Sequence, residues 1–281
     1  DYLKNNVFIP ARMQSTMVDK QRDIILNRSE GYEKNAERKI VNAPLADLSI
    51  KVAGGGILST ANDLLLFSKA LLENKLIKQS TLEMMIRKSK LKSGKDIDYG
   101  LGFSLTFEND SLIYFSHNGA GTGFSSMLLI DPKLKAASVH LINIRDRNLG
   151  EPAKDLLEMS ISDSIIKPTK TLSDVLMKTY ISAGIDSTNK TLNYIYSNEQ
   201  NVYTLNENEA IFFADDLTEL KKIPDAITYL KDIIKLYPKS FMVLVSLADT
   251  YLKDNNLGLA LKYYRLAAQI DNTNSRVNNL I

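Results

Sequence analysis

The middle of the chain alternates between apolar and polar residues with a period of two, which is typical of half-buried β-strands. Four such runs follow one another, at 99–107, 112–116, 124–130 and 136–144. Together they predict an antiparallel sheet. A stretch with apolar residues at helical spacing, 151–165, then predicts an amphipathic helix packed on one face of that sheet.

The residues before the predicted sheet are mostly polar and irregular up to about residue 50, and helical after that. Ser59 or Thr60 is a natural N-cap, and Asp63 follows Thr60 by three residues, a variant of the capping box. Apolar residues at helical spacing predict a helix from there to about residue 74, and a second helix over 79–87. The three glycines 54–56 indicate positive φ angles or a close approach of the backbone to another segment.

The sequence changes character at Lys167-Pro168-Thr169, where we place a domain boundary between 1–167 and 168–281. Beyond it, helical patterns recur with a period of 34 residues. The matched pairs are Ala214 and Ala248, Leu217 and Tyr251, Ala226 and Ala260, Leu230 and Tyr264, Ile233 and Ala267, and Pro238 and Asn272.

A 34-residue period, with small residues where helices cross and a proline after the second helix, resembles tetratricopeptide repeats. The two clearest repeats are 207–240 and 241–274, and 172–206 is expected to be a degenerate leading repeat. The predicted fold class is therefore α+β, an antiparallel sheet packed with helices, followed by an all-α tetratricopeptide-like domain.

Composition excludes several classes of function. The chain has 281 residues, a formal net charge of +2 and no cysteine, so it offers no disulfide framework, thiolate metal site or cysteine nucleophile. No basic cluster is dense enough to indicate a nucleic-acid partner, and no apolar run approaches the ~18 residues of a membrane span. His140 has no second histidine near it in the sequence, so we expect neither a metal site nor a cofactor.

The most informative feature is His117-Asn118-Gly119, set between two apolar runs. A polar, glycine-containing turn that joins or interrupts such runs indicates a strand edge held open for a ligand. Three other motifs accompany it in order: AGGGILST..DL at 53–64, YGLGF at 99–103 and LLIDP at 128–132. In that order, with HNGAGTGFSS at 117–126, they resemble the serine β-lactamase-like hydrolases, a family of class C β-lactamases, D-alanyl-D-alanine carboxypeptidases and esterases, over about residues 1–165.

The resemblance implies an acyl-transfer site, expected to attack a small-molecule or peptide amide, β-lactam or ester through an acyl-enzyme. By resemblance, His117-Asn118-Gly119 is the third motif of that site, and His117 hydrogen-bonds a tyrosine or a substrate carboxylate. Gly119 lets the substrate lie against the strand, and the backbone N–H of Ala120 donates to the oxyanion. An exported, periplasmic or secreted location is also what the resemblance implies.

The family's other two motifs, Ser-x-x-Lys and Tyr-x-Asn, are not found before His117 at the expected distance. Three Ser-x-x-Lys strings occur, at Ser89, Ser164 and Ser187, about as many as chance gives. Tyr196-Ser197-Asn198 spells the tyrosine motif but falls in the helical region, so we interpret it as a coincidence.

The first sixteen residues resemble a family segment that normally follows the tyrosine motif. We therefore expect the chain to be the C-terminal part of such a hydrolase and to be inactive alone. An incomplete sheet would leave an edge open to a partner chain or a second copy. The alternative function is a non-catalytic module that binds a protein or peptide through the helical repeats.

Overall fold

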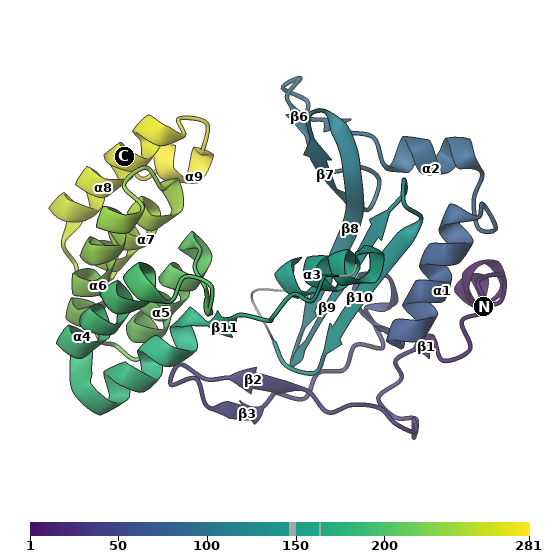
Figure 1. Cartoon of the computed structure of the whole chain (residues 1–281), viewed down its shortest axis with the longest axis horizontal. Coiled ribbons are helices and arrows are strands. Elements are labelled where there is room, and N and C mark those ends of the chain that lie inside the picture. The colour runs from purple at the N-terminus through teal and green to yellow at the C-terminus, as the bar shows by residue number, and fades with distance from the viewer. Residues whose placement is uncertain (146–149, 163) are drawn as a thin grey trace. The chain divides into compact units, whose positions relative to one another are not determined.

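The computed structural model describes residues 1–145, 150–162 and 164–281 (Figure 1). These residues form two compact units. The first contains 1–33 and 40–167, and the second contains 34–39 together with 168–281. The short segment 34–39, which the sequence analysis placed in the first domain, thus belongs to the helical unit.

The first unit is built on one antiparallel sheet with the strand order β10-β9-β8-β7. The strands are β7 (Ser104–Glu108), β8 (Ser111–Gly121), β9 (Phe124–Asp131) and β10 (Ala136–Ile142). Phe115 of β8 pairs with Ile130 of β9, and Ala137 of β10 pairs with the same Ile130. Directly paired side chains share a face, so these residues point to one side of the sheet.

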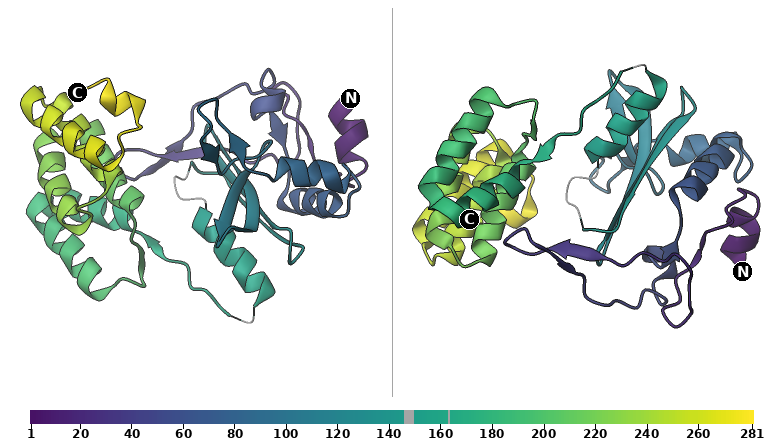
Figure 2. Two further views of the ribbon diagram at one scale, coloured as in Figure 1. Left: turned by 90° about the horizontal axis from the view of Figure 1, so that it is seen from above. Right: turned by 60° about the horizontal axis from the view of Figure 1, so that its bottom comes forward.

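Helices cover both faces of this sheet (Figure 2, right). On the face of Phe115, α1 (Ala61–Leu72) and α2 (Gln79–Met85) contribute Leu71 and Leu82 to the buried cluster. On the opposite face lies α3 (Gly150–Ile161), where the Ser138 hydroxyl donates a 2.6 Å hydrogen bond to the Ala153 carbonyl. The predicted α+β architecture is confirmed.

Two predicted strand boundaries are wrong for reasons that the hydrogen bonds explain. The run 99–107 becomes a strand only from Ser104, because Gly100 N–H bonds the Phe103 carbonyl at 2.8 Å and folds 99–103 into a tight loop. The run 112–116 continues to Gly121, because β9 pairs with it to the end. His117-Asn118-Gly119 therefore lies inside a strand, and the turn comes at 122–123.

The N-terminal region has short elements held by specific hydrogen bonds. Thr60 caps α1 by accepting from the Asp63 N–H at 3.2 Å, which confirms the predicted cap. The buried Asp63 carboxylate accepts from Ser15 N–H and from the Thr16 hydroxyl, both at 2.7 Å, and so fastens 15–16 to the helix start. The short elements are η1 (Lys4–Phe8), β1 (Met17–Val18), β2 (Tyr32–Lys34), β3 (Ile40–Asn42), η2 (Val52–Gly54), β4 (Ile57–Leu58), β5 (Ser89–Lys90) and β6 (Asp96–Ile97).

The glycine run 54–56 serves both purposes that the sequence indicated. Gly55 has φ of 139°, which L side chains rarely adopt. A Cβ on Gly56 would lie 2.3 Å from the Leu48 carbonyl oxygen, so the backbone approaches that loop too closely for any side chain.

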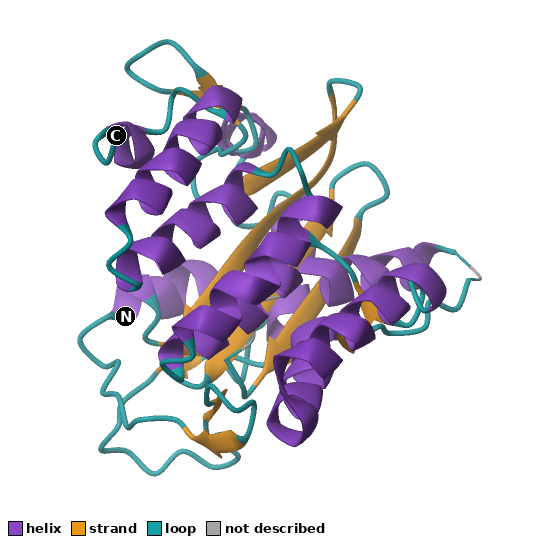
Figure 3. Ribbon diagram, turned by 90° about the vertical axis from the view of Figure 1, so that its left-hand side faces the viewer, coloured by secondary structure: helices purple, strands orange, loops and turns teal. Residues whose placement is uncertain are grey.

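The second unit consists of helices packed side by side around one core (Figure 3). Its elements are β11 (Lys170–Thr171), α4 (Leu172–Asn198), β12 (Tyr203–Thr204), α5 (Glu207–Glu219), α6 (Ile223–Leu236), α7 (Phe241–Lys253), α8 (Leu257–Ile270) and α9 (Ser275–Asn278). Gly184, with φ of 75°, divides α4 into two helices. Helix α7 starts 34 residues after α5, and α8 starts 34 residues after α6.

The repeated small residues lie where these helices pack. Ala214, Ala226, Ala248 and Ala260 are at most 2% exposed, and all four belong to the same hydrophobic cluster. A methyl side chain lets two helix backbones approach closely, and larger residues fill the remaining space. In the part of the chain that the structure describes, no helix is both long and apolar enough to cross a membrane.

Candidate functional site

The second half of β8 has one open edge. Strand β7 pairs with β8 only as far as Ser116, whereas β9 pairs with it through Gly121. Among the described residues, the stretch 117–121 therefore has a sheet neighbour on one side alone. Backbone N–H and C=O groups along such an edge are available to an extended ligand, which can add as a further strand.

The ring of His117 is oriented by two contacts. Its Nδ1 lies 2.7 Å from the Asn118 carbonyl oxygen, and its Nε2 lies 3.3 Å from the Tyr99 hydroxyl. A carbonyl oxygen can only accept, so Nδ1 carries the proton, and in the neutral ring Nε2 accepts from Tyr99. The two rings meet edge to face, with centroids 6.5 Å apart.

Tyr99 is a residue that the sequence analysis did not nominate. It lies in the YGLGF motif, which the sequence analysis used only for the family resemblance. The loop 99–103 folds back against α2, with Leu101 N–H bonded to the Met85 carbonyl at 2.9 Å. That fold brings the Tyr99 hydroxyl to His117, 18 residues further along the chain.

Beyond Asn118, β8 carries only small residues up to its end, so no bulky side chain projects from the strand there. Gly119 lies directly opposite Ser126 of β9, and a Cβ at Gly119 would be 2.4 Å from the Ser126 hydroxyl oxygen. Ala120 and Gly121 follow, and both are exposed. His117 and Asn118 are also exposed, so the four residues nominated from the sequence lie together on one accessible stretch of strand.

The turn that ends this stretch is packed against the start of the β2–β3 hairpin. Gly123 has φ of 75°, and a Cβ there would lie 2.7 Å from the Gly31 backbone. Tyr32 N–H donates to the Gly123 carbonyl at 3.3 Å and to the Asn143 carbonyl at 3.0 Å. This close approach depends on glycine at both 31 and 123.

The other sequence strings that spell catalytic motifs lie elsewhere. Ser89 is in β5 and the Ser164 string is irregular, so neither places its serine and lysine on one helical turn. Ser187 and Lys190 do lie on a helix, α4, but in the helical unit. Tyr196 is also on α4, where its hydroxyl meets the Tyr237 hydroxyl at 2.7 Å.

Burial raises the pKa of Tyr196 well above the usual value for tyrosine, which opposes formation of a phenolate base. His140 lies mid-strand in β10, opposite Met127, and its Nδ1 is buried without a hydrogen-bond partner. Within 1–145, 150–162 and 164–281, no group of three or more histidine, aspartate or glutamate side chains is arranged to hold a metal ion.

The Beta-lactamase family model matches residues 1–161 of this sequence. The chain belongs to the β-lactamase family. Similar family proteins include the mouse serine β-lactamase-like protein LACTB, mitochondrial, which is 30% identical over 158 residues, 47% of this chain and 28% of its own length. Penicillin-binding protein 4* of Bacillus subtilis (strain 168) is 27% identical over 140 residues, 46% of this chain and 31% of its own. This chain thus spans about three tenths of each of these relatives.

Solved structures of other proteins also align with part of this chain. A D-stereospecific amidohydrolase from Streptomyces sp. aligns with a TM-score of 0.46 and 21% identity, over 58% of this chain and 48% of that one. A penicillin-binding protein from Bacillus halodurans aligns with a TM-score of 0.44 and 18% identity, over 52% and 45%.

Proposed function

We propose that the first unit supplies the third motif of a serine hydrolase site that acts on an amide, β-lactam or ester through an acyl-enzyme. The observation that carries this proposal is the open edge of β8 at 117–121, beside an oriented histidine. A substrate laid along that edge would gain backbone hydrogen bonds without a steric obstacle at Gly119.

In this proposal each residue of the strand has a separate role. The Nδ1–H bond to the Asn118 carbonyl fixes the ring of His117, so that Nε2 is available to a hydroxyl group. Tyr99 occupies that position at 3.3 Å, a loose contact that a substrate hydroxyl or a catalytic tyrosine could replace. The Ala120 N–H would donate to the oxyanion of the tetrahedral intermediate.

The nucleophile and its base would come from Ser-x-x-Lys and Tyr-x-Asn residues outside this sequence. Among the described residues of the first unit, neither Ser-x-x-Lys string, at Ser89 or at Ser164, places its serine and lysine on one helical turn. An exported location is proposed with the function.

The first test is whether a serine of the 281-residue chain becomes acylated. We expect intact-mass spectrometry to find no covalent adduct after incubation with benzylpenicillin or a fluorophosphonate, because no activated serine is present. A stoichiometric adduct mapped to one serine, lost on Ser→Ala replacement there, would contradict the proposal.

The gene sequence before the codon for Asp1 is the complementary test. A Ser-x-x-Lys helix followed by Tyr-x-Asn is expected there, and a frame without both would contradict the assignment.

A second candidate function, peptide binding by tetratricopeptide-like repeats, is supported by a groove in the helical unit. The groove has a volume of about 490 Å³ and is lined by residues of α5, α7 and α9. Its apolar lining residues are Ile211, Phe241, Met242, Val245 and Leu252. The Asp249 carboxylate beside them already accepts hydrogen bonds from Arg276, at 2.7 Å, and from the Tyr264 hydroxyl. The proposed ligand is therefore a peptide with apolar side chains.

Met242 is the best residue at which to test this groove, because its side chain lines the groove and is 47% exposed. We expect peptides selected from a random displayed library to bind Met242→Asp at least roughly tenfold more weakly, since an uncompensated carboxylate would replace an apolar contact. Leu257→Asp, at a 66% exposed position outside the groove lining, is the matched control. Equal loss in both variants, or no selected peptide, would contradict the second function.

A further inference from the structure

The Tyr99 hydroxyl and the His117 ring present only hydrogen-bond acceptors to a ligand. The Nδ1–H of His117 donates to the Asn118 carbonyl at 2.7 Å, so Nε2 carries a lone pair. The Tyr99 hydroxyl has a single proton, which it donates to that lone pair at 3.3 Å. The lone pairs of the Tyr99 oxygen remain for a ligand. These two groups, which we call the acceptor pair, therefore suit a ligand N–H or O–H group.

The acceptor pair lies where an extended ligand would pass. Such a ligand adds to β8 at 117–121, on the side where β7 has ended. Loop 99–103 leads into β7, and Tyr99 forms an isolated bridge with Ser104 at its start. Tyr99 therefore lies on the same side of β8 as the open edge. It is 39% exposed, and His117 is exposed as well, so both are accessible.

The segments around the acceptor pair are uncharged. Loop 99–103, the edge 117–121 and the facing part of β9, 124–128, contain no lysine, arginine, aspartate or glutamate. Asp98, next to Tyr99, is an acid and lies 2.9 Å from the Lys88 ammonium group. Within the described residues, no ammonium or guanidinium group contacts the Tyr99 hydroxyl or the His117 ring.

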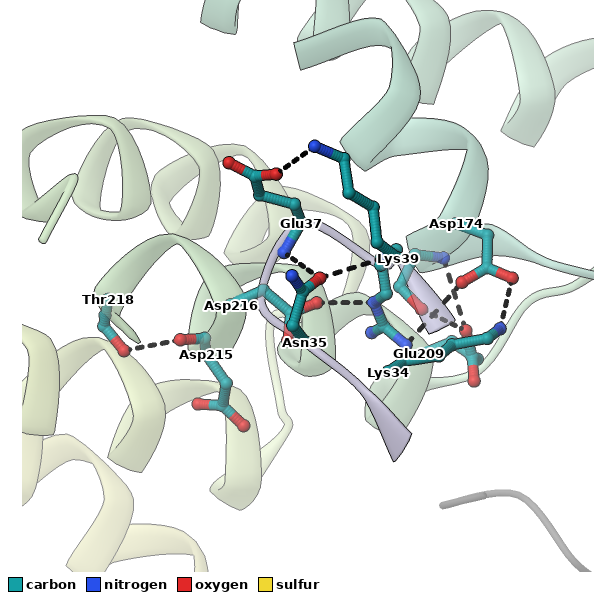
Figure 4. A network of polar contacts seen from close by, with 11 residues as sticks. Lys34, Asn35, Glu37, Lys39, Asp174, Glu209, Asp215, Asp216 and Thr218 are labelled. Carbon is teal, nitrogen blue, oxygen red and sulfur yellow. Dashed lines mark hydrogen bonds and ion pairs between the residues drawn. The ribbon is translucent and has the colours of Figure 1, made fainter. Parts of the chain in front are cut away.

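This chain surrounds its own carboxylates differently. In the helical unit, the Arg38 Nε lies 2.6 Å from Asp216 and the Lys34 Nζ lies 2.6 Å from Asp174 (Figure 4). Both of those carboxylates meet a cation, whose nitrogens are donors only. An ionised carboxylate is an acceptor only, so beside the acceptor pair it would meet lone pairs and no cation.

We propose that the acceptor pair makes the site selective for an uncharged amide or ester that carries an N–H or O–H group where it passes His117, and against a substrate with a free carboxylate there. This inference rests on the proposed hydrolase function and narrows its substrate class. Neutral peptide amides and esters are favoured over penicillin-type β-lactams, which carry a carboxylate. Of the two partners that the sequence left open for His117, a tyrosine and a substrate carboxylate, the geometry favours the tyrosine.

NMR spectroscopy of the 281-residue chain tests the donor and acceptor assignment without an activity assay, because the chain has only two histidines. We expect long-range ¹H–¹⁵N spectra of the ¹⁵N-histidine-labelled chain at neutral pH to show His117 protonated at Nδ1 and unprotonated at Nε2. His117→Gln identifies its signals. A ring protonated at Nε2 would overturn the inference.

The ligand test uses a matched pair of peptides, acetyl-trialanine amide and acetyl-trialanine with a free carboxylate. We expect the amide to shift the His117 Nε2 signal and the Gly119 and Gly121 amide signals, and the acid to bind at least roughly fivefold more weakly for want of a hydrogen bond. The His140 signals, from mid-strand in β10, should not move.

The outcomes separate this inference from the function on which it rests. Equal or tighter binding of the acid would overturn the inference and leave the open edge intact as a ligand site. No shift at Gly119 or Gly121 with either peptide would contradict the inference and the proposed function together.

Three variants locate the selectivity. His117→Lys replaces an acceptor by a cation at an exposed position and should invert the preference, so that the acid binds more tightly. Ser111→Lys is the matched control, because it adds the same charge to an exposed position of β8, roughly 20 Å along the strand, where salt screens it. Arg87→Gln removes the basic residue whose carbonyl lies beside Gly100 and should change neither affinity. Inversion by Ser111→Lys, or weaker acid binding by Arg87→Gln, would overturn the inference.

Discussion

Replacing Gly100 by alanine is expected to lower the free energy of unfolding of the first unit by about 2–3 kcal/mol. A Cβ at this position would lie 1.9 Å from the Met85 carbonyl oxygen and 3.2 Å from the Arg87 carbonyl oxygen. Both obstacles are backbone atoms, so the loop itself would have to move. Because Tyr99 is the neighbouring residue, its hydroxyl would move away from His117.

Urea titration followed by peptide-resolved hydrogen exchange measures this effect, since it separates the stability of the two units. Gly54→Ala is the control, because a Cβ at Gly54 meets nothing within 4 Å. We expect that variant to change the free energy of unfolding by less than about 0.5 kcal/mol. Equal stability of the two variants would show that the loop 99–103 adjusts without cost, and the account of Gly100 would be wrong.

Truncating Phe213 to alanine is expected to lower the free energy of unfolding of the helical unit by about 3–5 kcal/mol. Phe213 is fully buried on α5, with its ring centroid 4.8 Å from that of Tyr229 and 6.0 Å from that of Tyr180. Both contacts are edge to face, so the change would remove ring contacts as well as open a cavity.

The same exchange experiment in urea reports this loss in the peptides of α5 and α6. Leu257→Ala on α8 is the matched control, because that side chain is 66% exposed and its removal opens no cavity. A change of less than about 1 kcal/mol is expected for the control. If Phe213→Ala costs no more than Leu257→Ala, the repeats do not share the single core described above.

Much of the fold could be predicted because its signals are local. The period-two pattern located all four strands of the sheet, since one face of each strand must be buried. The Thr60 cap was predicted from residues three apart, and the 34-residue helical offset from the recurrence of small residues such as Ala214 and Ala248. Each of these features depends on neighbours along the chain or on a repeated unit.

The site could be predicted only in part. The sequence located His117, Asn118, Gly119 and Ala120 through a family resemblance, but it placed them at a turn. The strand continues through them because β9 pairs up to Gly121, and pairing partners are not encoded in the alternation of one strand. Tyr99 was missed because its hydroxyl reaches His117 only through the fold of the 99–103 loop.

The sequence by itself therefore determined the fold class, the helical repeat period and which residues along the chain form the candidate site. The tertiary structure decided which distant groups meet. Arg38 and Asp216 are 178 residues apart in the chain, and Lys34 and Asp174 are 140 apart. In the sequence these are ordinary charged residues of a polar segment and of two helices. Their pairing depends on burial and on long-range packing, and neither can be recognised from a periodic pattern in the sequence.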